Sequence, residues 1–215
     1  MKINLNKIIK YLILSDLVFY TGWGLISPIF AIFILDMIQG GNAFVVGMAA
    51  AISLIVRSIV RIPFGLYVDK DKTQRRAYWY MVLGLFVGAL IPFGFIFSKL
   101  PMHIYILQAI FGVSMAMSTA GWTCIFSRRI DKNKESTEWG VDAVAVGLGP
   151  GIAALVGGIA VTYFSFTYVF IAVALLGLIG VVLLLVIKKD VLCSPCPDGK
   201  LFLHREVRRL KKTRI

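Results

Sequence analysis

Charged residues are scarce in this chain, and acidic residues are the scarcest. Only 16% of its 215 residues are charged, and 11 acidic residues stand against 23 basic ones. A soluble domain carries about a quarter charged residues. The scarcity argues against a soluble globular protein, and the 59% hydrophobic content indicates a protein that lies in a membrane.

Motifs for catalysis and for cofactors are also missing. No glycine loop precedes a Lys-Ser or Lys-Thr pair, and no constellation of nucleophile and base stands out. Cys124 lies within a hydrophobic run, whereas Cys193 and Cys196 have zinc-ligand spacing and are followed by His204. One such pair is only half a zinc site, so two tails would have to supply four thiolates. Reduced thiols are the simpler interpretation, and we predict no enzyme, no cofactor and no resident metal.

The N-terminus lacks the pattern of a cleavable signal peptide. Lys2, Lys7 and Lys10 could form a basic start, but the apolar stretch behind them contains Asp16 and runs past the usual length. No small-residue cleavage site ends this stretch. The first hydrophobic run is therefore interpreted as a membrane span.

Six hydrophobic runs are long enough to cross a bilayer, which takes about 20 helical residues. They are apolar all round and lack the alternation of a membrane β-barrel. The sequence predicts an all-α membrane protein, with an N-terminal segment (1–10), a six-helix transmembrane domain (11–189) and a basic tail (190–215). The predicted spans are Tyr11–Leu35, Ala43–Leu66, Ala77–Phe97, Met102–Phe126, Gly140–Tyr163 and Phe166–Ile187.

The net charge of +12 is distributed on one side of this six-span arrangement. Nearly all basic residues fall in the N-terminus, the second and fourth connections and the tail, whereas the opposite connections hold only Lys99. This asymmetry follows the positive-inside rule and places both termini in the cytoplasm of a multi-pass cell-membrane protein. It also argues against nucleic acid as the partner of the basic residues.

The basic tail has two open interpretations. Leu201, Leu203, Val207 and Leu210 alternate with basic residues, which fits a short amphipathic helix lying on anionic lipid. A solvated tail without regular structure fits the composition equally well.

Polar side chains are concentrated in the first, second, fourth and fifth spans. Because such groups are costly in hydrocarbon, we expect them to face one another around a polar interior. Asp16 could pair with Arg57 or Arg61 and exchange that partner for a proton or an anionic substrate. Arg61 could instead extend to the interface, and Asp16 could be structural. Asp142 completes the predicted charge relay.

Aromatic and amide side chains in the same spans are candidates for contact with a small substrate, because they can stack on it or hydrogen-bond to it. Tryptophan also occurs as an ordinary interfacial anchor, which is the alternative for two of them. The candidates are Tyr20, Trp23, Gln108, Thr119 and Trp122.

Glycine is frequent in the fifth span, around Gly149 and Pro150 and again at Gly157 and Gly158. Small residues allow close helix packing, and a Gly-Pro step permits a bend. Tight static packing and a hinge for conformational change both remain open.

Several of these segments together resemble the major facilitator superfamily. The stretch Gly65-x-x-x-Asp69-Lys70, which ends in Arg75-Arg76, is similar to the family's loop between helices two and three. Gly22-Trp23-Gly24 with Pro28 resembles its first helix, and Gly149-Pro150 resembles its fifth. Many proton antiporters of the family have an arginine four residues before a glycine in helix four, whereas this chain has Gln108 before Gly112.

The resemblance implies one six-helix half of a transporter whose halves are parallel repeats. A six-span chain with both ends inside has the topology to form the second half from another copy of itself. The resemblance also implies that Asp69 latches the cytoplasmic face by reaching the N-terminus of the other half's fifth span, near Ser136-Thr137-Glu138. The alternative for Asp69 is a local cap with Arg75 or Arg76.

The sequence thus predicts alternating-access transport of a small solute by a parallel homodimer, with proton coupling open. One alternative is a membrane scaffold or accessory protein whose basic tail binds lipid or protein. The other is half of a split transporter that needs a different partner half.

Overall fold

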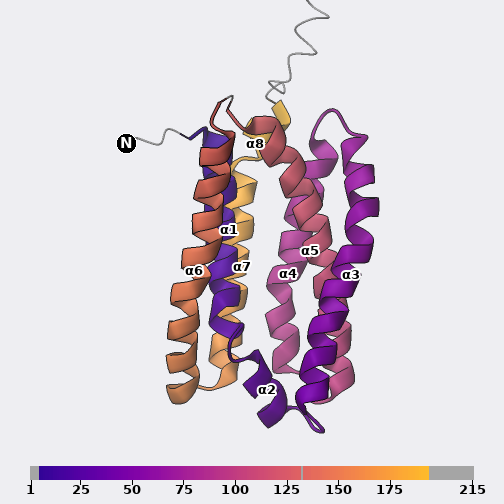
Figure 1. Cartoon of the computed structure of the whole chain (residues 1–215), viewed down its shortest axis with the longest axis vertical. Coiled ribbons are helices and arrows are strands. Elements are labelled where there is room, and N and C mark those ends of the chain that lie inside the picture. The colour runs from indigo at the N-terminus through magenta and orange to yellow at the C-terminus, as the bar shows by residue number, and fades with distance from the viewer. Residues whose placement is uncertain (1–4, 132, 194–215) are drawn as a thin grey trace, which may run out of the picture.

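The computed structural model describes residues 5–131 and 133–193, and this part of the chain is helical (Figure 1). Six of its helices are long and apolar enough to cross a membrane, which confirms the predicted all-α membrane fold. They are α1 (Lys7–Ile26), α3 (Ala43–Asp69), α4 (Arg75–Ile96), α5 (Pro101–Arg129), α6 (Glu135–Tyr163) and α7 (Phe166–Val186). Two short helices, α2 (Phe30–Met37) and α8 (Lys188–Cys193), complete it.

The first predicted span, Tyr11–Leu35, is wrong in one respect, because it divides into α1 and α2. Pro28 stands between the two helices, where it has no N–H to donate and its ring would clash with the preceding turn of a continuous helix. The Ser27 N–H still bonds the Trp23 carbonyl oxygen at 2.9 Å, and the helix ends there.

The connections are shorter than predicted. The helix α3 runs three residues past the predicted Leu66, so Gly65 and Asp69 lie on its last turns and not in a loop. The helix α5 continues to Arg129, and α6 already begins at Glu135. Ser136 and Thr137 therefore lie inside the first turn of α6 and do not cap it; its N-cap is Lys134, without a side-chain cap bond.

Side chains define several helix starts. The Asn6 side chain accepts a hydrogen bond from the Ile8 N–H at 2.8 Å, and the Asn42 side chain accepts one from Val45 at 3.0 Å. Ser165 caps α7 in the same way. These caps satisfy N–H groups that the first turn of a helix leaves without partners.

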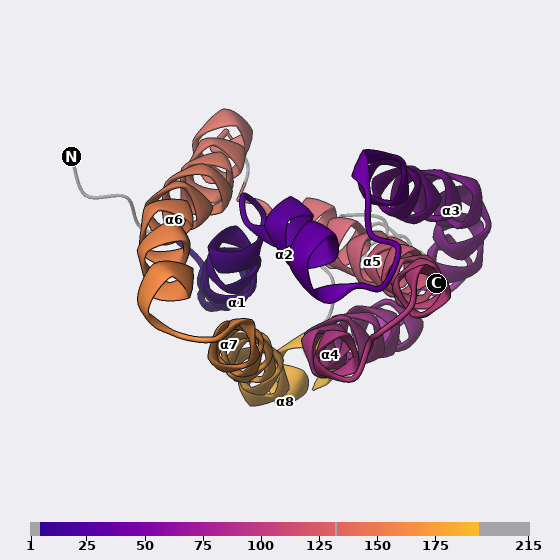
Figure 2. The same ribbon diagram turned by 90° about the horizontal axis from the view of Figure 1, so that it is seen from below.

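The helices form two groups of three that meet along one side (Figure 2). In the first group α1 packs against α6 and α7, and in the second α5 packs against α3 and α4. Packing of α4 against α7 joins the groups. Seen from below, α3 and α6 stand at the far ends of the opposite side, with α1 and α5 between them.

Burial follows this arrangement. Only 11% of the most apolar stretch of α3, and the same share of α6, is buried within the chain, against 50% for α4 and 44% for α7. The side bounded by α3 and α6 is therefore the side with the fewest intrachain neighbours.

Most of the predicted basic tail, residues 194–215 with Cys196 and His204, lies outside the described residues, as does Lys2. The start of α1, the α3–α4 and α5–α6 connections and α8 lie at one end of the molecule (Figure 1). This is the end that the positive-inside rule assigns to the cytoplasm.

Candidate functional site

A cavity of about 540 Å³ lies between α1, α3, α5 and α6, the four helices expected to line a polar interior. One residue from α4, Leu85, also reaches it. The cavity brings together six of the predicted site residues, which are Asp16, Tyr20, Arg61, Thr119, Trp122 and Asp142. Polar groups distant in sequence thus meet in one space.

The remaining candidates have other surroundings. Arg57 does not line the cavity itself, but its guanidinium donates to the hydroxyl of Thr119, which does, at 3.3 Å. Trp23 stacks on Phe111 with ring centroids 4.1 Å apart and does not line the cavity. Gln108 is buried among the helices and does not line it either. Both side chains thus lie outside the cavity lining, and their role as substrate contacts stays a prediction.

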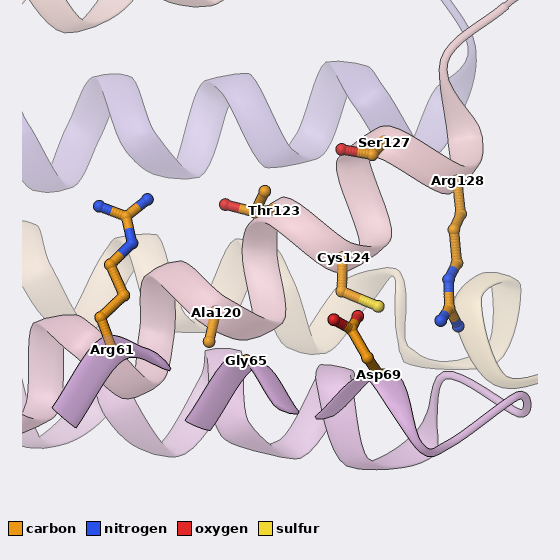
Figure 3. A pocket seen from close by; sticks show the side chains of 8 residues that line it. All are labelled: Arg61, Gly65, Asp69, Ala120, Thr123, Cys124, Ser127 and Arg128. Atoms are coloured by element: carbon orange, nitrogen blue, oxygen red, sulfur yellow. The ribbon is translucent and has the colours of Figure 1, made fainter. Parts of the chain in front are cut away.

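The proposed pairing of Asp16 with an arginine is not present. Among the residues that the structure describes, no ion pair joins Asp16 to Arg57 or to Arg61. Arg61 and Asp16 line the same cavity from different helices, so their charges share a space without direct contact. Arg61 also extends away from α3 across the face of α5, and not simply toward the helix end (Figure 3).

Two buried polar atoms at the cavity have no partner. Within residues 5–131 and 133–193, the Asp142 Oδ1 accepts no hydrogen bond and the Trp122 Nε1–H donates none, although these residues are only 9% and 8% exposed. Buried polar groups are normally satisfied, and leaving one without a partner is costly. The two atoms offer one acceptor and one donor to whatever occupies the cavity.

Trp139 is a cavity residue that the sequence did not single out. Its ring meets that of Trp122 edge to face, with centroids 5.7 Å apart. It follows Glu138 in the first turns of α6. A single tryptophan near the end of a membrane helix is typical of an interfacial anchor. Its position three residues before Asp142, on the same helix face, was the available signal.

A second cavity of about 290 Å³ adjoins the first toward the predicted cytoplasmic end (Figure 3). Gly65, Asp69 and Arg128 line it, and Arg61 lines both cavities. The Asp69 carboxylate points toward α5, near Cys124, and has no hydrogen bond or ion pair within the described ranges. An added Cβ at Gly65 would meet nothing within 4 Å.

The local cap that was the alternative role for Asp69 belongs to Asp71. Its carboxylate accepts bonds from the Thr73 hydroxyl at 2.6 Å, the Thr73 N–H at 2.8 Å and the Arg76 N–H at 2.7 Å. Burial raises the pKa of Asp71, but these hydrogen bonds outweigh it and hold the pKa below its ordinary value. The Asp-x-Thr spacing before a helix was the signal for this turn.

Two arginines at this end of the molecule contact the α3–α4 turn or the end of α3. The Arg76 guanidinium lies 4.7 Å from the centre of the Tyr67 ring, and Arg128 donates to the Asp71 carbonyl oxygen at 3.0 Å. Lys70 and Arg75 are exposed. The turn is thus held to α3 and α5, and Asp69 is left facing the cavity.

Arg129 joins four segments at this end of the molecule. Its guanidinium donates to Gln74 Oε1 at 2.9 Å and to the Val191 carbonyl oxygen at 3.2 Å, and its own carbonyl oxygen accepts from Asn6 at 3.0 Å. Lys7 and Asp190 add an ion pair at 2.8 Å. The N-terminus, the α3–α4 connection, α5 and α8 therefore hold together independently of any second chain.

The glycines of α6 divide between two faces. Gly149 and Gly157 lie against α1, where an added Cβ at Gly157 would collide with the Leu25 carbonyl group. Pro150 also lies against α1, because an added Cβ at Gly24 would come within 2.5 Å of its Cα atom. Gly147, Gly151 and Gly158 have nothing within 4 Å of an added Cβ. Static packing thus accounts for one face, and the other is open.

Comparison with known proteins agrees with this architecture. No curated protein matches the chain. The family model described as Major Facilitator Superfamily matches residues 12–200, which is most of the chain. Members of this family are membrane transporters. The chain belongs to the major facilitator superfamily.

Proposed function

We propose that this protein moves a small solute across the membrane by alternating access, as a parallel homodimer in which each copy supplies half of the central cavity. The proposal rests on one observation: a polar cavity lies beside two helices that have little cover within the chain. The cavity lies between the helices that bear its charges, and α3 and α6 at its edges are the least buried spans.

We expect the exposed face of α3 to fit against the small-residue face of α6. One face of α3 carries the large apolar side chains of Leu54 and Ile62, which are 62% and 70% exposed. The open face of α6 carries the small residues Gly147, Gly151 and Gly158. Helices in membranes associate where small residues of one admit the side chains of the other. A two-fold axis along the membrane normal would set α6 of one copy against α3 of its partner.

The homodimer also supplies hydrogen-bond donors for the Asp69 carboxylate. This carboxylate stands at the end of α3 without a partner in the described residues, and α6 begins at the same end of the molecule. The N-terminus of a helix attracts anions. We propose that Asp69 reaches the start of the partner's α6 when the cytoplasmic side closes, so that the latch occurs twice.

The mass of the protein in mild detergent, together with cross-linking in lipid, tests this proposal. We expect a dimer, and cross-links between cysteines introduced at Leu54 on α3 and at Gly151 on α6 of different copies, which lie at similar depths in the two helices. The control is a pair of cysteines at Leu83 on α4 and Ile179 on α7. Both positions are exposed, and these two helices form the back of the molecule, on the side away from α3 and α6. This pair should give no cross-link between copies. Only monomer, or equal cross-linking of both pairs, would overturn the homodimer. Capture of a different six-helix chain would instead support the split transporter.

Proton coupling through Asp16 is a separate part of the proposal. Proteoliposomes that contain a pH-sensitive dye report proton movement when amino acids, sugars, organic anions or organic cations are added outside. We expect one class to drive protons in the wild type, and Asp16→Asn to abolish that signal. Asp36→Asn, at an exposed position of α2, is the control. Full proton movement by Asp16→Asn would exclude the proton role, and no solute movement of any kind would favour the scaffold.

A further inference from the structure

The central cavity carries opposite charges on different walls. Arg61 comes from α3, whereas Asp142 comes from α6 and Asp16 from α1, which packs against α6. Figure 2 shows α3 and α6 at opposite ends of the row that α1 and α5 complete. The cavity therefore has a basic side and an acidic side.

These charges do not neutralise one another. In residues 5–131 and 133–193, no ion pair joins either aspartate to Arg61. Charges held in a membrane interior without partners are expensive, and they mark substrate or ion pathways. A ligand that carries both signs would satisfy both walls at once.

The unsatisfied atoms fit the same kind of ligand. Asp142 Oδ1 needs a donor and Trp122 Nε1–H needs an acceptor, and both residues line the cavity with less than a tenth of their surface exposed. An ammonium group donates hydrogen bonds and accepts none, whereas a carboxylate accepts and donates none. Neither group alone serves both atoms.

Aromatic rings add to the cavity lining, two of them on the acidic side. Trp122, Trp139 and Tyr20 all line the cavity. Ring faces attract cations and also pack against the apolar body of a ligand. A volume of about 540 Å³ lies within the range of small-molecule sites, which hold roughly 300–1,000 Å³.

From these observations we infer that the cavity binds a small zwitterion, with its ammonium group at Asp142 and Asp16 and its anionic group at Arg61 and the Trp122 indole N–H. The inference rests on the proposed transport function and names the class of its substrate. An amino acid or a betaine is the simplest molecule of this kind.

Thermal unfolding of the full-length protein in mild detergent tests the charge requirement. The probes are the common L-amino acids and glycine betaine, with the methyl ester of each amino acid as the cation and its N-acetyl derivative as the anion. We expect at least one zwitterion to raise the unfolding temperature and neither of its blocked derivatives to match it, because only ligands that bind the folded state stabilise it. The inference is overturned if no zwitterion stabilises the protein, or if an ester or N-acetyl compound stabilises it as well. Stabilisation by a blocked compound would leave solute transport itself intact, so the two failures are distinguishable.

Two substitutions assign the ends of the ligand. Asp142→Asn should weaken binding of the stabilising zwitterion at least about tenfold, a loss of about 1.4 kcal/mol, while binding of its N-acetyl derivative stays the same or improves. Arg61→Gln should likewise weaken binding of the zwitterion, while binding of its methyl ester stays the same or improves. Glu135→Gln on α6 and Lys10→Gln on α1 remove charges from exposed positions outside the cavity and should change neither. Equal loss of zwitterion and both blocked derivatives would overturn the assignment. Asp142→Glu, which keeps the charge, should retain the selectivity and serves where the Asn variant does not fold.

Discussion

The helices α3 and α6 are as apolar as α4, yet they are buried to a very different extent. About half of the apolar stretch of α4 lies within the chain, against 11% for α3 and for α6. On the back of the molecule, α4 and α7 pack against each other and join the two groups of helices. On the front, α3 and α6 flank a charged cavity and have few neighbours. The back joins the two groups of helices, and the front is where we expect assembly and transport.

The largest expected effect is on assembly. Gly151→Trp places a bulky ring on the open face of α6, where nothing lies within 4 Å of an added Cβ. Because the glycine face is proposed to receive α3 of the partner, we expect dimerisation to weaken at least about tenfold, which is about 1.4 kcal/mol. Fluorescence energy transfer between labelled copies in lipid measures it. Ile179→Trp on α7, 50% exposed on the back, is the control and should leave dimerisation unchanged. If Gly151→Trp left dimerisation unchanged, the open face of α6 would not be the assembly surface.

A neighbouring pair of glycines sharpens the comparison within α6 itself. Gly157 faces the Leu25 carbonyl group on α1, whereas Gly158 faces open space. Gly157→Ala should therefore lower the free energy of unfolding by about 1–3 kcal/mol, the cost of overpacking, and Gly158→Ala should leave the monomer unchanged. Each alanine substitution is made in protein that also carries Gly151→Trp, under conditions where this protein is monomeric, and its unfolding in denaturant is measured. Equal effects of the two alanines would show that α6 has no distinct open face.

A smaller effect is expected at Arg129, which ties α5 to the α3–α4 connection and α8 through its bonds to Gln74 and Val191. Arg129→Gln should lower the free energy of unfolding by about 1–3 kcal/mol, since it leaves buried acceptors without donors. The same measurement should show no loss in Arg75→Gln, because that side chain is exposed. Neither variant should change dimerisation, because both residues lie away from the side bounded by α3 and α6.

The smallest effect concerns the turn at Asp71. Its pKa lies below the ordinary value, so its stabilising effect is present above about pH 4 and is lost as the pH falls through the lowered pKa. Asp71→Ala should cost about 1 kcal/mol at neutral pH, the usual value of a cap, and progressively less on acidification. Thermal unfolding across pH measures this, with Lys72→Ala as the control. A difference that stays constant down to acidic pH would contradict the role of the carboxylate.

Hydrophobic runs and the distribution of basic residues predicted the helical class and the number of spans, because hydropathy is a local property of the sequence. The break near Pro28 was missed, since a proline inside a long apolar run does not by itself reveal whether the helix kinks or ends. The cavity residues were found only in part. Asp16, Arg61 and Asp142 stand out as charges in hydrocarbon, whereas Trp139 resembled an interfacial anchor. Trp23, predicted on the same grounds, stacks on Phe111 and lies outside the cavity lining.

By itself, the sequence determined that the chain is a bundle of six apolar helices with its basic ends on one side, because the costs of exposing backbone and charge to lipid act on each segment separately. Tertiary structure alone decided which polar groups meet. The packing of α1 against α6 brings Asp16 to the same cavity as Asp142, and α3 contributes Arg61 without pairing it to either. It also decided which of two adjacent glycines is packed and which is open, since contacts between distant segments depend on how whole helices are placed.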